Sequence, residues 1–169
     1  GVGFLWRQEQ SRFYRQRYEM ERQRQRLAQR YEYLTRYAKD IIVLADSDQH
    51  IVEVNDRAVK AYGYSREELL QLTLPDLWAT EARVGLNAAI ERLQRESASL
   101  HETLHQRKDG SIFPVEISAR VVTIDGQRFY LGIIRDITER VQAERTLREA
   151  HQNLNAIVQA SPLAILILD

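Results

Sequence analysis

Two Asp-Gly dipeptides, at 109–110 and 125–126, divide the second half of the chain into segments of strand length. Asp-Gly is a strong hairpin signal, because glycine readily adopts the positive φ of tight turns between antiparallel strands. A first strand is expected from Leu100 to Lys108. In the next two segments apolar residues alternate with polar ones, as in strands with one buried face. These apolar residues are Phe113, Val115, Ile117, Ala119 and Val121, then Phe129, Leu131 and Ile133. The sequence therefore predicts three successive antiparallel strands.

A second pair of strands is expected near residue 40. The apolar run 41–45 and the segment 50–54 have strand length, and Asp46-Ser47-Asp48 between them reads as a turn. These two segments therefore predict another hairpin. In the later group of strands, Pro114 predicts an edge position or a bulge, since proline has no amide proton to donate to a sheet.

Short helices are expected between the two groups of strands. Asn55 is a good N-cap for a helix that ends at Gly63, and Ser65 with Glu68 has the spacing of a capping box. Residues 75–78 are expected to form a loop, and 80–96 carry apolar residues at helical spacing. The element order predicts an α+β fold, in which an antiparallel sheet has its helices on one face.

Long helices are expected on both sides of this body. Residues 7–40 contain no Gly or Pro, and an apolar residue recurs every seven positions from Trp6 onward. Such a repeat is typical of a coiled coil, although the second apolar column is poor, and a single amphipathic helix packed on its own domain is the alternative. A second seam follows at 143–157. The predicted dimer seam comprises Phe13, Met20, Leu27, Leu34, Leu147 and Leu154.

The chain ends suggest a larger protein. Residues 1–6 are apolar and aromatic, and arginines follow at once, as at the inner end of a transmembrane helix; a cloning remnant is the competing explanation. Residues 1–40 carry ten basic and five acidic side chains, although the whole chain has no net charge. Residues 164–169 repeat the apolar strand and final Asp of 41–46, which predicts the start of a second copy of the domain.

Residues 38–138 resemble a PAS domain of the sensory-box type. The resemblance rests on segments 41–46, 51–55, 63–69, 107–111 and 135–140. It implies a five-stranded antiparallel sheet that cups a small cavity, in a sensory or dimerising module of a bacterial signalling protein. It also implies flanking helices that carry signals to an output domain in the same chain, a histidine kinase or a diguanylate cyclase or phosphodiesterase. The expected parts are a signalling helix (1–37), the PAS domain (38–138), a linker helix (139–160) and a truncated strand (161–169).

Several kinds of cofactor site are excluded by residues that the sequence lacks. The chain has no cysteine, which excludes disulfides, thiolate metal sites and the cysteinyl-flavin adduct of light-sensing relatives. Haem is not expected, because haem-binding relatives typically use a histidine on the long helix, and 80–96 has none. His101 and His105 are expected on the polar side of their strand, as surface or interface residues. No metal site, catalytic constellation or base-reading motif is recognised, and no nucleic-acid partner is expected; a non-covalent flavin stays open.

The predicted pocket lies between the long helix and the sheet and would take a small apolar or planar molecule. Its residues are Tyr62, Trp78, Leu86, Ile90, Leu93, Val115, Ile117, Leu131 and Ile133, with Tyr62 and Trp78 at the rim. Asp136 and Glu139 have capping-box spacing, so the exit helix is expected to start directly after the last strand. The predicted relay residues are Asp136, Ile137, Thr138 and Glu139.

Two functional hypotheses follow. In the first, a ligand in the cavity biases the flanking helices. In the second, the module dimerises and relays signals with a core filled by side chains. In both, we expect a homodimer on the cytoplasmic side of the inner membrane.

Overall fold

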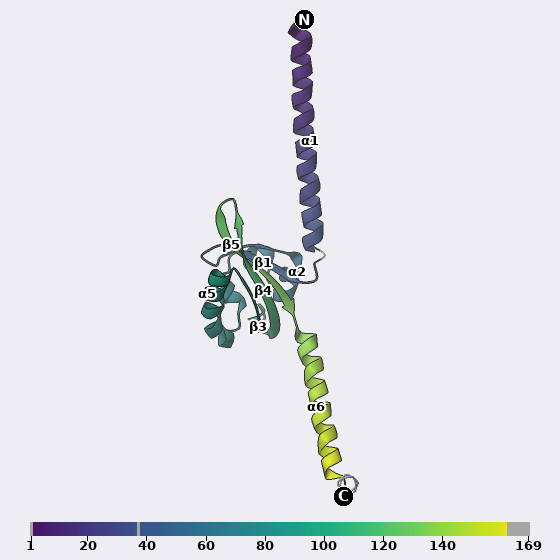
Figure 1. Cartoon of the computed structure of the whole chain (residues 1–169), viewed down its shortest axis with the longest axis vertical. Coiled ribbons are helices and arrows are strands. Elements are labelled where there is room, and N and C mark those ends of the chain that lie inside the picture. The colour runs from purple at the N-terminus through teal and green to yellow at the C-terminus, as the bar shows by residue number, and fades with distance from the viewer. Residues whose placement is uncertain (1, 37, 162–169) are drawn as a thin grey trace. The chain divides into compact units, whose positions relative to one another are not determined.

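The computed structural model describes the backbone of residues 2–36 and 38–161 and the side chains of residues 12–35 and 38–161. Within these residues one antiparallel sheet has the strand order β2-β1-β5-β4-β3. Figure 1 shows this sheet with α5 beside it. The strands are β1 (Ile41–Ala45), β2 (Ile51–Val54), β3 (Ala98–Gln106), β4 (Ile112–Ile124) and β5 (Gln127–Asp136). The helices are α1 (Val2–Arg36), α2 (Asp56–Tyr62), α3 (Arg66–Leu69), α4 (Leu74–Leu77), α5 (Leu86–Glu96) and α6 (Thr138–Ala160). The predicted fold class is confirmed.

The predicted hairpins form where the turn chemistry places them. β4 and β5 are joined by Asp125 and Gly126, with φ of +50° and +77°, as a two-residue turn of this kind requires. Gly110 has φ of +84° in the connection between β3 and β4. β1 pairs with β2 and also with β5, where Ile42 lies opposite Ile133. This last pairing joins the two groups of strands, so β5 is the central strand of the sheet.

The first two insert helices also begin where predicted, and the first of them ends where predicted. The Asn55 side chain accepts a hydrogen bond from the Ala58 amide at 3.1 Å, and Gly63 ends α2 with φ of +76°. The Asn55 side chain also bonds the backbone of β1 at Ile42, which holds α2 to the sheet. Ser65 caps α3, and Glu68 completes the capping box. These local signals therefore identify the helix starts correctly.

The later part of the insert differs from the prediction. Residues 75–78 are not a loop, because α4 occupies most of them. Thr73 and Asp76 form a capping box there, and Pro75 fits the first turn of a helix, where its missing amide proton is not needed. The segment 80–96 is not one helix. Residues 80–85 form a 3₁₀-helix that ends at Gly85, and α5 begins at Leu86.

Pro114 does not mark an edge strand, since β4 lies between β5 and β3. It lies one residue beyond the β5 ladder, which ends where Val115 pairs with Asp136. The Pro114 carbonyl accepts a hydrogen bond from the Ile137 amide at 3.1 Å, on the β5 side. In an antiparallel strand the N and O of a residue point to the same side, so the missing Pro114 amide costs the sheet no ladder bond.

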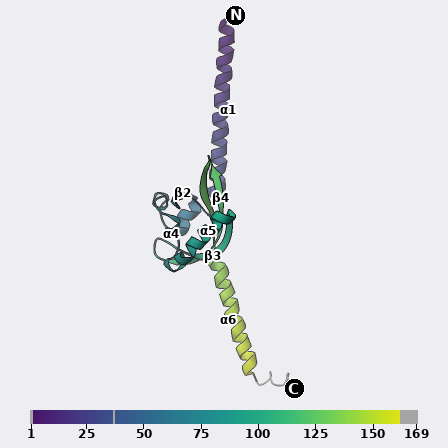
Figure 2. The same cartoon turned by 60° about the vertical axis from the view of Figure 1, so that its left-hand side comes forward.

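The core lies between the sheet and the insert. α2 packs on β1. α5 packs on β3 and β4, beside which it lies in Figure 2. On β5 the buried residues are Tyr130 and Ile134, and Ile133 is 42% exposed, so the predicted inward face of this strand is wrong. The run 129–134 is apolar at every position except Gly132, and alternation cannot identify the buried face of such a run.

α1 and α6 are single long helices. None of the helices within the described residues combines the length and the apolar character needed to cross a bilayer. The predicted membrane end at 1–6 and the predicted second copy at 161–169 fall almost wholly on residues whose side chains lie outside the described set. Both stay predictions.

Candidate functional site

A cavity of about 60 Å³ lies between α5 and the sheet. Its walls come from α4, α5, β1, β3, β4 and β5, and most of its lining side chains are apolar. In the part of the chain that the structure describes, the lining includes no Asp, Glu, Lys or Arg. Six of the predicted pocket residues line it: Trp78, Leu86, Ile90, Leu93, Ile117 and Leu131.

The other predicted pocket residues lie elsewhere. Val115 and Tyr62 are fully buried in the core, and Ile133 is on the exposed face of β5. The predicted rim positions are wrong, because Tyr62 is 0% and Trp78 6% exposed. Each ring has a large apolar area, and its burial between the insert and the sheet stabilises the core.

Three polar residues of β3 also line the cavity, and sequence reasoning missed them. These are Ser99, His101 and His105, called here the β3 wall. They share one strand face, because their positions differ by two and by four and side chains alternate between the faces of a strand. The expectation that both histidines are surface or interface residues on the polar side of the strand is wrong for His105, which is 1% exposed, and His101 is half-buried. Leu100, on the other face, is 64% exposed.

His105 is held by aromatic neighbours. Its Nδ1 lies 2.7 Å from the hydroxyl of Tyr62, and its ring contacts those of Trp78 and Phe113 with centroids 5.7 and 6.3 Å away. Burial, with a smaller contribution from His101, lowers the pKa of His105 to about 3. Burial also raises the pKa of Tyr62. Both groups are therefore neutral at physiological pH.

The second candidate site is the exit junction, formed by Asp136, Ile137 and Thr138 between β5 and α6. The Asp136 carboxylate accepts hydrogen bonds from the Thr138 amide at 2.9 Å and from its hydroxyl at 2.5 Å. Its other oxygen lies 3.2 Å from Nη2 of Arg107. Burial opposes ionisation of Asp136, but the bonds from Thr138 and Arg107 outweigh it and lower its pKa. Ile137 is buried.

Asp136 does not cap α6 as predicted. It is the last residue of β5, Ile137 occupies the N-cap position without a side-chain bond, and Glu139 is exposed. The carboxylate bonds two residues ahead, the pattern of an Asx turn. The pairing of Asp136 with Val115 keeps the residue in the sheet, and this tertiary restraint overrides the local capping-box spacing. The predicted direct connection between strand and helix is present.

Arg107 joins the exit junction to α2. Its guanidinium donates to the Ala61 carbonyl of α2 as well as to Asp136, and it lies 3.6 Å from the centre of the Phe113 ring. Two more ion pairs flank the junction. Arg135 bonds both oxygens of Asp40, at 3.0 and 2.8 Å, and Arg140 of α6 pairs with Glu102.

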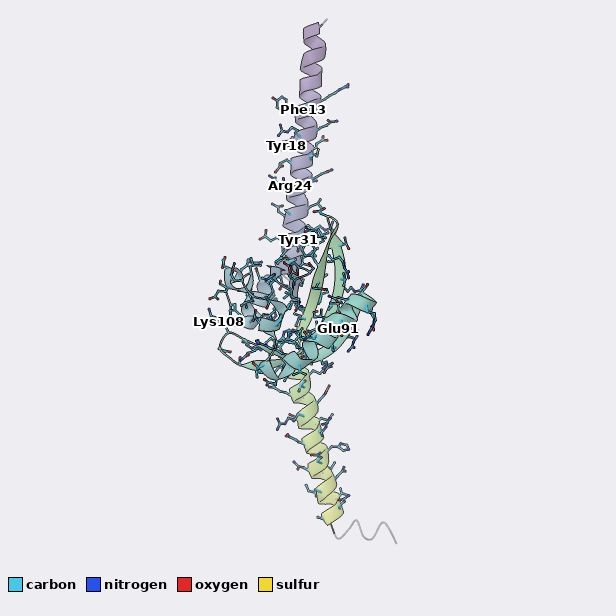
Figure 3. All side chains as sticks on the ribbon, turned by 90° about the vertical axis from the view of Figure 1, so that its left-hand side faces the viewer. Phe13, Tyr18, Arg24, Tyr31, Glu91 and Lys108 are labelled. Carbon is cyan, nitrogen blue, oxygen red and sulfur yellow. The ribbon has the colours of Figure 1, made fainter. Side chains whose placement is uncertain are left out.

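The flanking helices carry the predicted seam residues on exposed surfaces. Phe13, Met20, Leu27 and Leu34 are 56 to 70% exposed on α1, and Figure 3 shows Phe13, Tyr18 and Tyr31 projecting from that helix. Leu147 and Leu154 are 69% and 58% exposed on α6. Whether these stripes bind a second chain stays a prediction. The described residues contain no group of three or more His, Asp or Glu placed to hold a metal.

Comparison with known proteins places these features in a family. A family model with the description "PAS domain" matches residues 39–139, more than half of the chain. Sensor histidine kinase TmoS of Ectopseudomonas mendocina is 27% identical over 126 residues, which cover 72% of this chain and 13% of that protein. Diguanylate cyclase DgcM of Escherichia coli O157:H7 is 29% identical over 119 residues, covering 70% and 29%.

A solved structure shares the fold. The PAS domain of an HTR-like protein from Haloarcula marismortui matches with a TM-score of 0.64 and 26% identity, over 70% of this chain and 98% of that one. The chain spans between 11 and 29% of the length of the curated relatives it matches.

Proposed function

This chain belongs to the PAS domain family, and we propose that it senses and relays a signal inside a longer protein. A change in the sheet passes through the exit junction into α6 and on to an output domain in the same chain. The kinase and the cyclase among the relatives support an output of one of these two types. Nothing catalytic is assigned to the PAS segment itself.

The observation that carries this proposal is the Asp136 carboxylate. It belongs to the last ladder pair of β5, and it bonds the first residue of α6. Only Ile137 separates strand from helix, and its amide is held by the Pro114 carbonyl of β4. A shift or rotation of the strand end must therefore move the start of α6, because no flexible loop absorbs it.

Dimerisation through the flanking helices is part of the same proposal. Single helices leave large apolar side chains of α1 and α6 in water, and these recur at the seven-residue spacing of coiled-coil seams. A parallel homodimer would bury both stripes and would align the two copies of α6. A change in the angle or rotation of the α6 pair is then a signal that a dimeric output domain can read.

A ligand-free relay is the second candidate. The small volume of the cavity favours it, since this cavity has about 60 Å³, less than half of the roughly 150 Å³ of a dry cavity that holds benzene. A flavin ring system, which is larger than benzene, does not fit the cavity as it stands. Signals from a preceding helix would in this case enter through α1 and leave through α6.

We also propose that the chain lies at the cytoplasmic face of a membrane. Apolar and aromatic residues 1–6 followed by arginines support this placement, because positive charge is enriched on the cytoplasmic side of membrane helices. Membrane fractionation of the full-length parent protein tests it. Recovery of the parent protein in the soluble fraction, with residues preceding this segment included, would contradict it.

The relay proposal is tested with two matched aspartates. Asp109, in the connection between β3 and β4, binds the amide and hydroxyl of Ser111 at 2.9 and 2.6 Å, almost as Asp136 binds Thr138. Asp136→Ala and Asp109→Ala thus remove similar turns, each worth about 1 kcal/mol on the scale of a lost cap. In the full-length parent, Asp136→Ala should alter or lock the output activity, and Asp109→Ala should leave its response to signal unchanged.

The melting temperature of the 169-residue chain is measured beside the output. Both variants should melt close to the wild type. Unchanged output and unchanged response in Asp136→Ala would refute the relay role, and outright unfolding would show that Asp136 is a structural residue only.

A further inference from the structure

The buried polar atoms that lack a partner are concentrated in one place. Within the described residues they are the Ser99 hydroxyl oxygen, His101 Nε2 and His105 Nε2. All three atoms belong to residues of the β3 wall, which line the same cavity. Buried polar groups are nearly always hydrogen-bonded, because leaving one unpaired is destabilising. Three in a single wall, opposite apolar side chains, indicate that something else satisfies them.

The protonation state of His105 decides which group faces that occupant. If the Tyr62 hydroxyl donates to Nδ1, the tyrosine is satisfied and the neutral ring carries its proton on Nε2. The reverse arrangement would leave both the tyrosine proton and Nε2 unpaired in the core. The first arrangement leaves fewer buried groups unpaired, so His105 presents an N–H donor without a protein partner.

The remaining walls restrict the occupant further. Residues such as Leu86, Ile90 and Ile117 offer no hydrogen bonds, and no charged side chain lines the cavity within the described residues. A cavity of roughly 150 Å³ holds benzene, with its six non-hydrogen atoms, so about 60 Å³ limits the occupant to about two or three such atoms at the same density, and to about four if the cavity is filled more tightly. A charged group would lose its hydration here without a counter-charge, and water alone would face apolar side chains over most of the cavity.

We propose that the cavity binds a small uncharged molecule of two to four non-hydrogen atoms with an oxygen that accepts a hydrogen bond, such as a short ketone or alcohol. The oxygen faces the N–H of His105, with Ser99 and His101 beside it, and the apolar part faces α5. This inference rests on the proposed sensory function and gives its ligand class. Binding would also affect the last residue of α2, because the Tyr62 hydroxyl is hydrogen-bonded to His105.

The test uses acetone, which can accept but not donate a hydrogen bond, titrated into the 169-residue chain at millimolar concentration. Two-dimensional amide NMR follows the residues around the cavity. We expect saturable shifts in α5, β3 and β4, and a dissociation constant about tenfold weaker in His105→Phe, which keeps an aromatic ring and loses the donor. Ser99→Ala tests the same wall with a smaller change. Leu100→Ala, on the opposite face of β3, should bind as the wild type does.

Ala119→Leu keeps the test decisive if His105→Phe does not fold. Ala119 lies opposite Ser99 on β4 and lines the cavity, so a larger side chain there should abolish the acetone shifts. The inference is overturned if acetone causes no saturable shifts, if only water occupies the cavity, or if binding is the same in His105→Phe and Ser99→Ala as in the wild type. Such a failure leaves the Asp136 experiment untouched, because that experiment reads coupling and not binding.

Discussion

The β3 wall and the exit junction differ in how their polar groups are satisfied. In the β3 wall His105 is buried and Ser99 and His101 are half-buried, and each of the three residues has one buried polar atom without a hydrogen-bond partner. At the exit junction, the Asp136 carboxylate binds Thr138 and Arg107, and the side chains of Asp136 and Arg107 are each 27% exposed. Unpaired polar groups in an apolar cavity favour the binding of a ligand that can bond to them, whereas a fully hydrogen-bonded ionic cluster holds its geometry. The contrast suits a receiving end and a transmitting end.

α2 contacts both regions at its last two residues. Tyr62 bonds His105 of the β3 wall, and the neighbouring Ala61 carbonyl accepts from Arg107, which binds Asp136. The Lys108 amide also bonds the Tyr62 carbonyl at 2.9 Å. A displacement of Tyr62 therefore has a short covalent and hydrogen-bonded route to the exit junction. The β3 wall and the exit junction can be perturbed separately, and each change can be measured as a change in the free energy of unfolding.

The largest effect should come from acidification of the β3 wall. The pKa of His105 is about 3 in the folded chain, against an ordinary value of 6.5. Below pH 6.5 the unfolded chain binds a proton that the folded chain does not, so stability falls by about 1.4 kcal/mol per pH unit. The titratable groups facing His105 are Tyr62, whose raised pKa keeps it neutral here, and His101, whose pKa burial also lowers.

Urea unfolding between pH 7 and pH 4 measures this effect. The wild type should lose roughly 3 kcal/mol more than His105→Gln, which keeps a hydrogen-bonding side chain and does not titrate. His151→Gln, at an exposed position on α6, serves as the control and should retain the wild-type slope. Equal slopes for His105→Gln and wild type would mean that the β3 wall is open to water.

The burial of His105 shows why part of the site could not be predicted. On β3 the leucines at 100 and 104 alternate with the histidines at 101 and 105, and the rule of apolar faces inward selects the leucines. β3 is an edge strand, and Leu100 faces outward. What stabilises His105 inside is Tyr62, 43 residues away in the sequence, and no local pattern reports such a contact.

Features with local causes were predictable. The Asn55 cap, the Ser65–Glu68 capping box and the Asp-Gly turns depend on residues within a few positions of each other. Asp136 marks the limit of this reasoning. Its spacing to Glu139 is that of a capping box, which does not form, because Asp136 belongs to the β5 ladder. Its carboxylate does bond an amide in the first turn of α6 and a cation, Arg107, and this cation is brought to it by a tertiary contact.

A smaller effect is expected at the exit junction. A double-mutant cycle of Arg107→Gln and Asp136→Asn should give a coupling energy of about 1 kcal/mol at pH 7. The exposed pair Arg145 and Glu149, 2.8 Å apart on α6, is the control and should give about 0.3–0.5 kcal/mol. Equal coupling in the two pairs would remove the distinction between the exit junction and an ordinary surface pair.

The Arg107–Asp136 coupling should also depend on pH. The pKa of Asp136 is lowered from 3.8, so its stabilising contribution is complete above that value and is lost as the pH falls through the folded pKa. The cycle repeated at a pH below the folded pKa should show no coupling. Persistence of the coupling there would mean that the neutral carboxyl group binds Arg107 as well as the carboxylate does.

The smallest effect on domain stability is expected from the seam of α1. Leu27→Asp with Leu34→Asp places two charges on side chains that are 67% and 62% exposed, so unfolding of the PAS domain should change by less than about 0.5 kcal/mol. Sedimentation should nevertheless shift from dimer toward monomer, because buried charges are not tolerated in a coiled-coil seam. Tyr18→Asp with Gln25→Asp is the matched control, with the same seven-residue spacing on another face of the helix. If the control variant dissociates the dimer equally, repulsion between the added charges explains the result. If neither double variant dissociates the dimer, the seam is not the dimer contact.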